Sequence, residues 1–220
     1  MADLESKWII NFHGIGRIER PYDPGEESVW ISKDRFLGIL DAIAGDPTFE
    51  ITFDDGNLSD LAIAVPELIE RDLTATFFIP AGKIGHPGFL GYEEIEALIA
   101  AGMPIGSHGW SHRSWRHLDP VARKAEFEES KRCLEEITGS SVDMAACPFG
   151  DYDRSALRSL KRAGYRRVYS SDRGWSFGSR FLEPRNTVHG DSDASSVVLE
   201  KNESRKSMAK TMKQAVKRWR

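Results

Sequence analysis

The chain has 220 residues, of which 40% are hydrophobic and 29% charged, and its formal net charge is −4. This is the composition of an ordinary globular protein, and the length suits a single domain. The acidic balance argues against a nucleic-acid-binding protein. Two cysteines are too few for a disulfide framework, and neither a signal peptide nor a membrane-spanning run is recognisable, so a cytoplasmic protein is expected.

Short β-rich runs alternate with helical patterns along the chain. Strands are predicted at 8–12, 49–53, 74–79, 104–107, 142–146, 167–171 and 180–182. Helices are predicted at 32–43, 58–71, 92–101, 119–138 and 153–163. Pro66 is an awkward interior residue for the second of these helices. The alternation predicts a parallel sheet or barrel with helices outside, and periodicity does not choose between an open doubly wound sheet and a distorted barrel.

Polar residues follow two of the predicted strands directly. Asp54 and Asp55 come after the second strand, and His108 and His112 come after the fourth. Both pairs therefore emerge at the same end of the sheet. Two imidazoles and one carboxylate are a common ligand set for zinc or a similar divalent ion, and a second carboxylate beside them suits a general base. Either pair alone fits a turn or surface histidines, but the combination indicates a metal site.

Two motifs carry a resemblance to a known family. Thr52-Phe53-Asp54-Asp55-Gly56 and Ser107-His108-Gly109-Trp110-Ser111-His112 resemble the first two motifs of the polysaccharide deacetylases, carbohydrate esterase family four, which includes the chitooligosaccharide deacetylases of nodulation. The resemblance runs from about Trp8 to His189. It implies an α/β fold, a distorted (β/α) barrel of about seven parallel strands, within a catalytic domain spanning 1–195.

The resemblance also implies roles for these residues. Asp54 would be the catalytic base that activates a metal-bound water, and the metal ligands would be Asp55, His108 and His112. Zinc is the expected metal, with cobalt, nickel or manganese as alternatives. The implied reaction is removal of an acetyl group from an N-acetylated saccharide. Hydrolysis of O-acetyl, formyl or cyclic amide groups, or saccharide binding with weak catalysis, are the alternatives.

The third family motif is altered in this chain. The family commonly has Arg-x-Pro-x-Gly or Arg-x-Pro-x-Tyr, whereas the chain reads Ala146-Cys147-Pro148-Phe149-Gly150. Without the arginine that holds the base, the pKa of Asp54 should rise unless another cation takes its place. Arg173 and Arg185, each beside a predicted strand end, are the candidates. The residues of this motif expected at the substrate site are Pro148, Phe149 and Gly150.

The last two family motifs are also changed. Ser171-Asp172-Arg173-Gly174-Trp175 resembles the fourth, which implies that Trp175 lines the acetyl pocket. Arg185-Asn186-Thr187-Val188-His189 resembles the fifth, which implies that His189 is the general acid. His13, at the end of the first predicted strand, is the second candidate for the acid, or supports its neighbours instead.

A basic segment, 196–220, follows the expected catalytic domain. Residues 201–220 contain eight Lys or Arg and one Glu, a local balance of +7. The apolar residues that recur there at helical spacing are Met208, Met212, Val216 and Trp219. This pattern is typical of an amphipathic helix on an anionic membrane or a protein partner, and a solvated or packed last helix is the plainer interpretation. The membrane interpretation fits a deacetylase of lipid-linked saccharides in exopolysaccharide biosynthesis, peripheral at the inner membrane.

Overall fold

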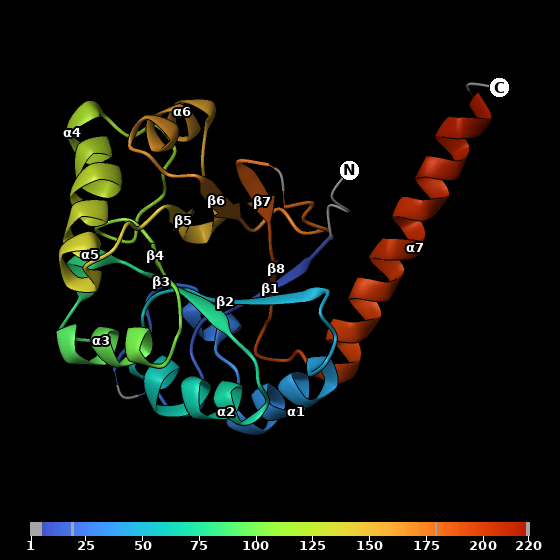
Figure 1. Cartoon of the computed structure of the whole chain (residues 1–220), viewed down its shortest axis with the longest axis horizontal. Helices are drawn as coiled ribbons and strands as arrows, with labels where there is room; N and C mark the ends of the chain where they lie inside the picture. The colour runs from blue at the N-terminus through green and yellow to red at the C-terminus, as the bar shows by residue number, and fades with distance from the viewer. Residues whose placement is uncertain (1–5, 19, 179, 219–220) are drawn as a thin grey trace.

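The computed structural model describes residues 6–18, 20–178 and 180–218, with side chains described up to residue 207. Its centre is a sheet of eight parallel strands, curled into a nearly closed barrel with the helices outside (Figure 1). The expected α/β distorted barrel is therefore confirmed. The strands are β1 (Trp8–Phe12), β2 (Phe49–Phe53), β3 (Ala75–Ile79), β4 (Ile105–Ser107), β5 (Met144–Ala146), β6 (Arg167–Ser170), β7 (Leu182–Pro184) and β8 (Asn186–Thr187). The helices are α1 (Lys33–Ile43), α2 (Val65–Glu70), α3 (Tyr92–Ala100), α4 (Pro120–Arg123), α5 (Ser130–Thr138), α6 (Arg154–Arg162) and α7 (Ala194–Arg218).

One extended segment closes the barrel by pairing with both edges of the sheet. The strand order is β7-β6-β5-β4-β3-β2-β1-β8, so β7 and β8 lie at opposite ends of it. In the chain, however, only Arg185 separates them. The segment thus pairs first with β6 and then with β1. Eight strands are found rather than about seven because the last expected strand continues beyond 182 and divides between these two pairings.

Two of the expected helices are composites with a π-helical portion. Asp60–Ala64 is a π-helix that leads into α2, and Pro66 then lies in the first turn of α2. The helix is nevertheless continuous, since Ala64 and Val65 both have right-handed helical backbone, so Pro66 lies where the hydrogen-bond pattern changes from π to α. A second π-helix, Lys124–Glu129, joins α4 to α5.

Successive side chains of each strand point to opposite faces of the sheet. One face packs against the outer helices and the other lines the barrel interior. Phe12, Phe53 and Phe77 stack on adjacent strands, with ring centroids 5.3 and 4.8 Å apart, and Phe36 of α1 meets Phe12 edge-on. The opposite faces of the strands point inward. They bury a small apolar cluster of Ile9, Phe78, Ala146 and Tyr169. The interior of the barrel is therefore packed below the site at its carboxyl end.

The last helix, α7, packs its first turns against α1 and then extends away from the barrel (Figure 1). Lys201 is buried, pairs with Asp46 and lies 4.2 Å from the ring centroid of Phe49. The helix begins at Ala194, two residues before the expected boundary. In the described part of the chain, no helix combines the length and hydropathy needed to cross a membrane. The apolar residues predicted for an amphipathic face lie outside the described side chains: Met208, Met212, Val216 and Trp219.

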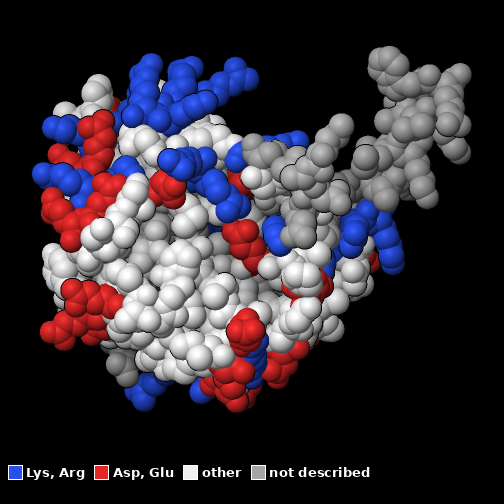
Figure 2. Space-filling model, viewed as in Figure 1, with Lys and Arg blue, Asp and Glu red and all other residues white. Residues whose placement is uncertain are grey.

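Charge is unevenly spread over the surface. Figure 2 shows Lys and Arg gathered over the end of the molecule that carries α6. The exposed residues of that helix include Arg154, Arg158, Lys161 and Arg162. This basic face is separate in sequence from the basic segment 196–220.

Candidate active site

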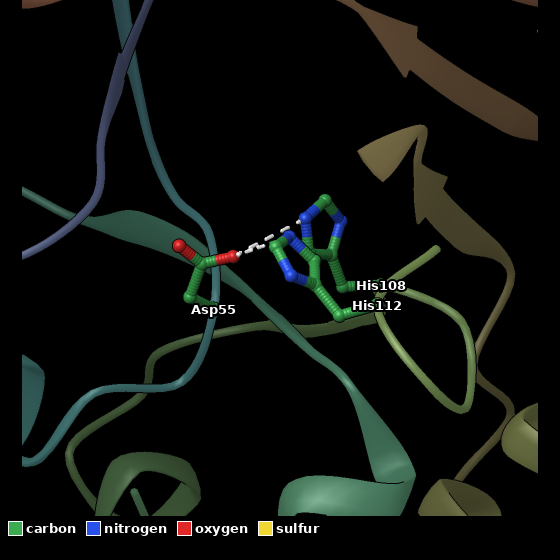
Figure 3. Close-up of side chains that lie close together, drawn as sticks. All are labelled: Asp55, His108 and His112. Carbon is green, nitrogen blue, oxygen red and sulfur yellow. Dashed lines mark ion pairs between the residues drawn. The ribbon is translucent and has the colours of Figure 1, made fainter. Parts of the chain in front are cut away.

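Three side chains meet at the carboxyl end of the barrel, as Figure 3 shows. Asp55 directly follows the end of β2, and His108 and His112 lie in the loop after β4. Asp55 Oδ1 lies 3.5 Å from His108 Nε2 and 3.0 Å from His112 Nε2. One donor atom from each residue lies within 4.8 Å of the others. The structure therefore brings together the three residues predicted as metal ligands.

Two of these residues have a left-handed backbone conformation, which costs free energy in residues other than glycine. Asp55 has φ of 76° and His112 has φ of 51°. Non-glycine residues in the left-handed region cost of order 1–3 kcal/mol and persist where the surroundings hold them. Both turns aim a side chain at the same point.

The donor set fits a divalent cation. The Nδ1 of His108 lies 2.9 Å from the carbonyl oxygen of Ala146, which only accepts, so Nδ1 carries the proton and Nε2 is left free as a ligand. Asp55 Oδ1 is buried and has no hydrogen bond of good geometry. Burial raises the pKa of Asp55, but contacts with His108 and His112 outweigh this and hold it well below its usual value. An ionised carboxylate with an unsatisfied oxygen beside two imidazoles is a suitable cation site.

Asp54 is clamped by a buried arginine. Arg185 Nη1 donates to Asp54 Oδ1 and Nη2 to Oδ2, both at 2.7 Å, while Asn11 Nδ2 donates to Oδ2 at 3.0 Å. Arg185 is fully buried, and its guanidinium carbon lies 5.3 Å from the ring centroid of Phe78. Burial raises the pKa of Asp54, but the Arg185 charge and hydrogen bonds hold it below its usual value. Asp54 is thus kept ionised and fixed in orientation.

Arg185 occupies the interior that the altered third motif leaves open. Ala146 is fully buried and faces the barrel interior with Phe78 and Tyr169, the same rings on which the Arg185 guanidinium lies. A small residue at 146 therefore leaves room for an arginine from the closing segment. Arg173, the other candidate, lies at the rim, where its guanidinium is 3.4 Å from Glu200. Of the two arginines, only Arg185 contacts Asp54 among the described residues.

A cavity of about 360 Å³ opens above these side chains. The predicted site residues that line it are Asp55, His108, His112, His13, His189, Phe149 and Arg173. Phe149 has φ of 58°, is 64% exposed, and lies with its ring centroid 4.7 Å from that of His112. It therefore presents an apolar ring to the cavity. Pro148 and Gly150, its neighbours in the third motif, are not among the residues that line the cavity.

Both histidines predicted as the general acid reach this cavity. His13 Nδ1 is buried without a hydrogen-bond partner among the described residues. Burial holds the pKa of His13 below its usual value, although the charges of Asp55 and Asp54 oppose that effect. His189 instead lies with Nε2 3.4 Å from Nη2 of Arg173. Since guanidinium only donates, this contact requires His189 Nε2 to accept.

The expectation that Trp175 lines the acetyl pocket is wrong. Trp175 is 6% exposed, and its ring centroid lies 5.4 Å from that of Trp8 at the start of β1. After β6 the chain returns to the opposite end of the barrel, where Ser176 forms an antiparallel bridge with Lys7. That path carries Trp175 into the core and away from the cavity.

Two features of the site were not predicted from the sequence. Asn11, which contacts Asp54 and Arg185, is a buried polar residue in an otherwise apolar strand, and that contrast was its only signal. One wall of the cavity is formed by 23–29. It is held by Arg20, which bonds both Glu26 and Asn57. No strand end marks this wall in the sequence.

Comparison with known proteins identifies relatives. The chain matches the family model described as polysaccharide deacetylase over residues 42–168. It is 26% identical to YheN of Bacillus subtilis (strain 168) over 149 residues, covering 66% of this chain and 50% of YheN. It is 28% identical to a chitin deacetylase of Pestalotiopsis sp over 128 residues, covering 58% of this chain and 42% of that protein. The chain thus spans about half the length of these curated relatives.

Solved structures share the fold. The deacetylase PplD of Streptococcus pyogenes, in complex with acetate, has a TM-score of 0.78 at 17% identity, covering 89% of this chain and 97% of that chain. IcaB from Ammonifex degensii has a TM-score of 0.69 at 23% identity, with the same two coverages of 89% and 97%. These likenesses concern the fold. The family rests on the sequence match, which includes the strand ends that carry Asp54, Asp55, His108 and His112. The chain belongs to the polysaccharide deacetylase family.

Proposed function

We propose that this chain is a metal-dependent hydrolase that removes acetyl groups from an N-acetylated saccharide. Its family supports hydrolysis of acetylated saccharides, and the site supports the finer assignment. The observation that carries the proposal is the position of Asp54. It is an ionised carboxylate held by Arg185, and its Oδ2 lies 3.9 Å from Nε2 of His108, one of the three potential ligands that line the cavity. The clamp argues against the alternative of a catalytically weak binding protein, because Arg185 gives Asp54 the partner that the altered third motif lacks.

The metal would be held by Asp55, His108 and His112. Two imidazoles and one carboxylate favour zinc, and cobalt, nickel and manganese suit the same donors. Bound there, the cation supplies Lewis-acid polarisation of the acetyl carbonyl and lowers the pKa of water.

The residues of the chain account for the proton transfers. Asp54 takes a proton from the attacking water, whose oxygen forms a bond to the acetyl carbon, and Arg185 and Asn11 keep its carboxylate in one orientation. The carbon–nitrogen bond then breaks, acetate forms, and the sugar amine leaves with a proton. Of the two histidines we favour His13 as the donor, because its buried Nδ1 has no hydrogen-bond partner among the described residues and its side chain lines the same cavity as the proposed ligands. His189 Nε2, by contrast, already has Arg173 Nη2 as a partner at 3.4 Å.

Acetate release from N-acetylated chitooligosaccharides, with metal content measured on the same sample, tests the function. Asp54→Asn should retain the metal and lose about 10²–10⁴-fold in kcat/KM, the range supplied by a general base. Arg17→Ala, an exposed position on the loop after β1, is the matched control. Bound metal with acetate release unchanged in Asp54→Asn would overturn the proposal. Release from O-acetyl or formyl substrates alone would favour the alternative reactions.

The leaving group distinguishes the two candidate acids. His13→Ala should be slow on the sugar amide, whose amine needs a proton, and near wild type on an aryl acetate, whose phenolate does not. His189→Ala should show no such dependence on the leaving group. The reverse result would assign the acid to His189.

We also propose contact between the basic segment 196–220 and an anionic surface of the inner membrane. The support is its local charge of +7 over residues 201–220 and the extension of α7 away from the barrel (Figure 1). Deletion of 208–220 should abolish flotation with vesicles of phosphatidylglycerol and phosphatidylcholine. Unchanged flotation would refute this contact and direct attention to the basic face of α6.

A further inference from the structure

The loop that joins the two histidine ligands is held by a buried carboxylate. Glu126, in the π-helix between α4 and α5, is 2% exposed. Its Oε2 accepts a hydrogen bond from the backbone N–H of Trp110 at 2.8 Å, and its Oε1 accepts from the N–H of Ser111 at 3.1 Å. The Ser111 hydroxyl donates to the same Oε1 at 2.5 Å. Three donors from one loop thus converge on one side chain.

This carboxylate depends on the loop for its stability. Burial of an ionised carboxylate is costly unless donors surround it. In the described part of the chain, no lysine or arginine forms an ion pair with Glu126, so the loop N–H groups supply most of the compensation. Successive backbone N–H groups that converge in this way form an anion-binding nest. The loop conformation and the buried charge therefore stabilise each other.

Local backbone geometry permits this close approach. Gly109 has φ of 78°, and a Cβ atom at that position would lie 2.3 Å from Glu126 Oε2. The π-helix buries Glu126 and Phe127 next to each other. Such π-helical turns are frequent at functional sites because they re-aim a side chain. Glycine in the loop and the widened helical turn each allow the contact.

The same helix holds the strand end that carries the other ligand. Ser130 Oγ donates to the carbonyl oxygen of Glu126 at 2.7 Å and lies 2.9 Å from Ser107 Oγ. Ser107 Oγ in turn accepts from the Gly109 N–H at 3.2 Å. Ser107 immediately precedes His108, so one helix fixes both ends of the turn between the ligands.

We propose that Glu126 is a positioning residue of the metal site. Through Trp110 and Ser111 it holds His112 at the place where its Nε2 reaches the same cation as His108. The inference rests on the proposed metal site, and nothing in the sequence motifs assigns this residue a role. Its effect is on metal affinity, transmitted through the loop.

Zinc titration of the metal-free protein by calorimetry tests this role. Glu126→Gln keeps the shape, but its amide nitrogen cannot accept, so at least one loop N–H loses its partner. The dissociation constant for Zn²⁺ should rise about 10–100-fold, the usual effect of losing a partner that orients a ligand. Glu128→Gln, on the exposed side of the same π-helix, should bind as the wild type does. The absorption spectrum of bound Co²⁺ should also change in Glu126→Gln.

A structural role alone would give a different result. If Glu126→Gln lowers the unfolding temperature of the metal-free protein but leaves the Zn²⁺ dissociation constant unchanged, the proposal is overturned. Should Glu126→Gln fail to fold, Ser111→Ala offers a milder test, because it removes one hydroxyl donor from an exposed residue. The Zn²⁺ dissociation constant of Ser111→Ala should rise about 3–10-fold. An unchanged dissociation constant in that variant would also overturn the proposal. Altered affinity without any acetate release would contradict the proposed reaction and leave this inference standing.

Discussion

At the scale of single residues, Asp54 and Arg185 form a bidentate ion pair inside the barrel. Two parallel bonds of 2.7 Å join fully buried partners. A bidentate guanidinium fixes the plane of the carboxylate as well as its charge, which a lysine does not do. Removal of one partner of such a pair leaves the other charge buried and unpaired.

Arg185→Ala should therefore cost both stability and activity. We expect about 3–5 kcal/mol less free energy of unfolding, measured by urea denaturation. The value of kcat/KM should fall by up to about 10²–10⁴-fold, the contribution of a positioned base. Arg166→Ala, an exposed arginine before β6, is the control.

Moving the arginine from position 185 to position 146, where the family commonly has it, tests whether a guanidinium from there can also hold Asp54. Ala146 faces the interior that Arg185 occupies, so Ala146→Arg in the Arg185→Ala background should recover part of the lost activity. In the wild-type background the same substitution should destabilise, because two arginines would compete for one space. No recovery in a folded double variant would show that residue 146 cannot reach Asp54.

The buried carboxyl of Asp60 predicts how the stability of the protein changes with pH. Burial, together with the charge of Asp55, raises the pKa of Asp60 well above its usual value, so the folded protein keeps this carboxyl neutral. As pH rises above about 4, the unfolded chain loses that proton and the folded chain does not, so stability falls. Asp60→Asn should remove this loss and be more stable than the wild type at pH 7, by a few degrees in Tm, but not at pH 4. If the curves of Tm against pH for the wild type and Asp60→Asn were parallel, Asp60 would not be a neutral carboxyl in the folded protein. Asp191→Asn, at an exposed position, is the control.

At the element scale, the strand ends explain which parts of the site could be predicted. Asp55 lies two residues after β2, and His108 and His112 lie in the loop that follows β4. Parallel strands bring such positions to one edge of the sheet. Arg185, 131 residues from Asp54, was one of two candidates for the partner of that carboxylate. The choice between it and Arg173 depends on how the last strand divides, which no local pattern encodes. Trp175 was misplaced for the same reason: the sequence does not show that the chain turns back after β6.

The docking of α7 can be tested at Lys201, which is buried and pairs with Asp46. Burial raises the pKa of Asp46, but the bond from Lys201 and bonds from Thr48 lower it to about 2. The Asp46 side chain is 40% exposed, so screening by solvent limits the ion pair to about 1 kcal/mol. Lys201→Met should destabilise by that amount at pH 7 and speed amide exchange over 194–207, and the stability difference should narrow as pH falls towards 2. Lys206→Met, an exposed change on the same helix, should do neither.

For the whole molecule, metal binding should appear as a gain in stability. A ligand that binds only the folded protein stabilises it by about 2.7 kcal/mol at a hundred times its Kd. The Tm of the chelator-treated protein should therefore rise with added Zn²⁺. His112→Ala should show little of this rise, because one of the three converging donors is lost. A Tm independent of Zn²⁺ in the wild type would exclude a specific site.

The segment that closes the barrel also sets the order in which the protein can become active. During synthesis Asp54 leaves the ribosome early, and the guanidinium that neutralises it follows 131 residues later. Until β7 and β8 dock onto β6 and β1, the interior holds an uncompensated carboxylate, and the open edges of the sheet remain unpaired. A nascent chain that has completed six strands therefore contains every proposed metal ligand and still lacks a working base. The proposed base therefore gains its guanidinium partner only when the last strands close the sheet.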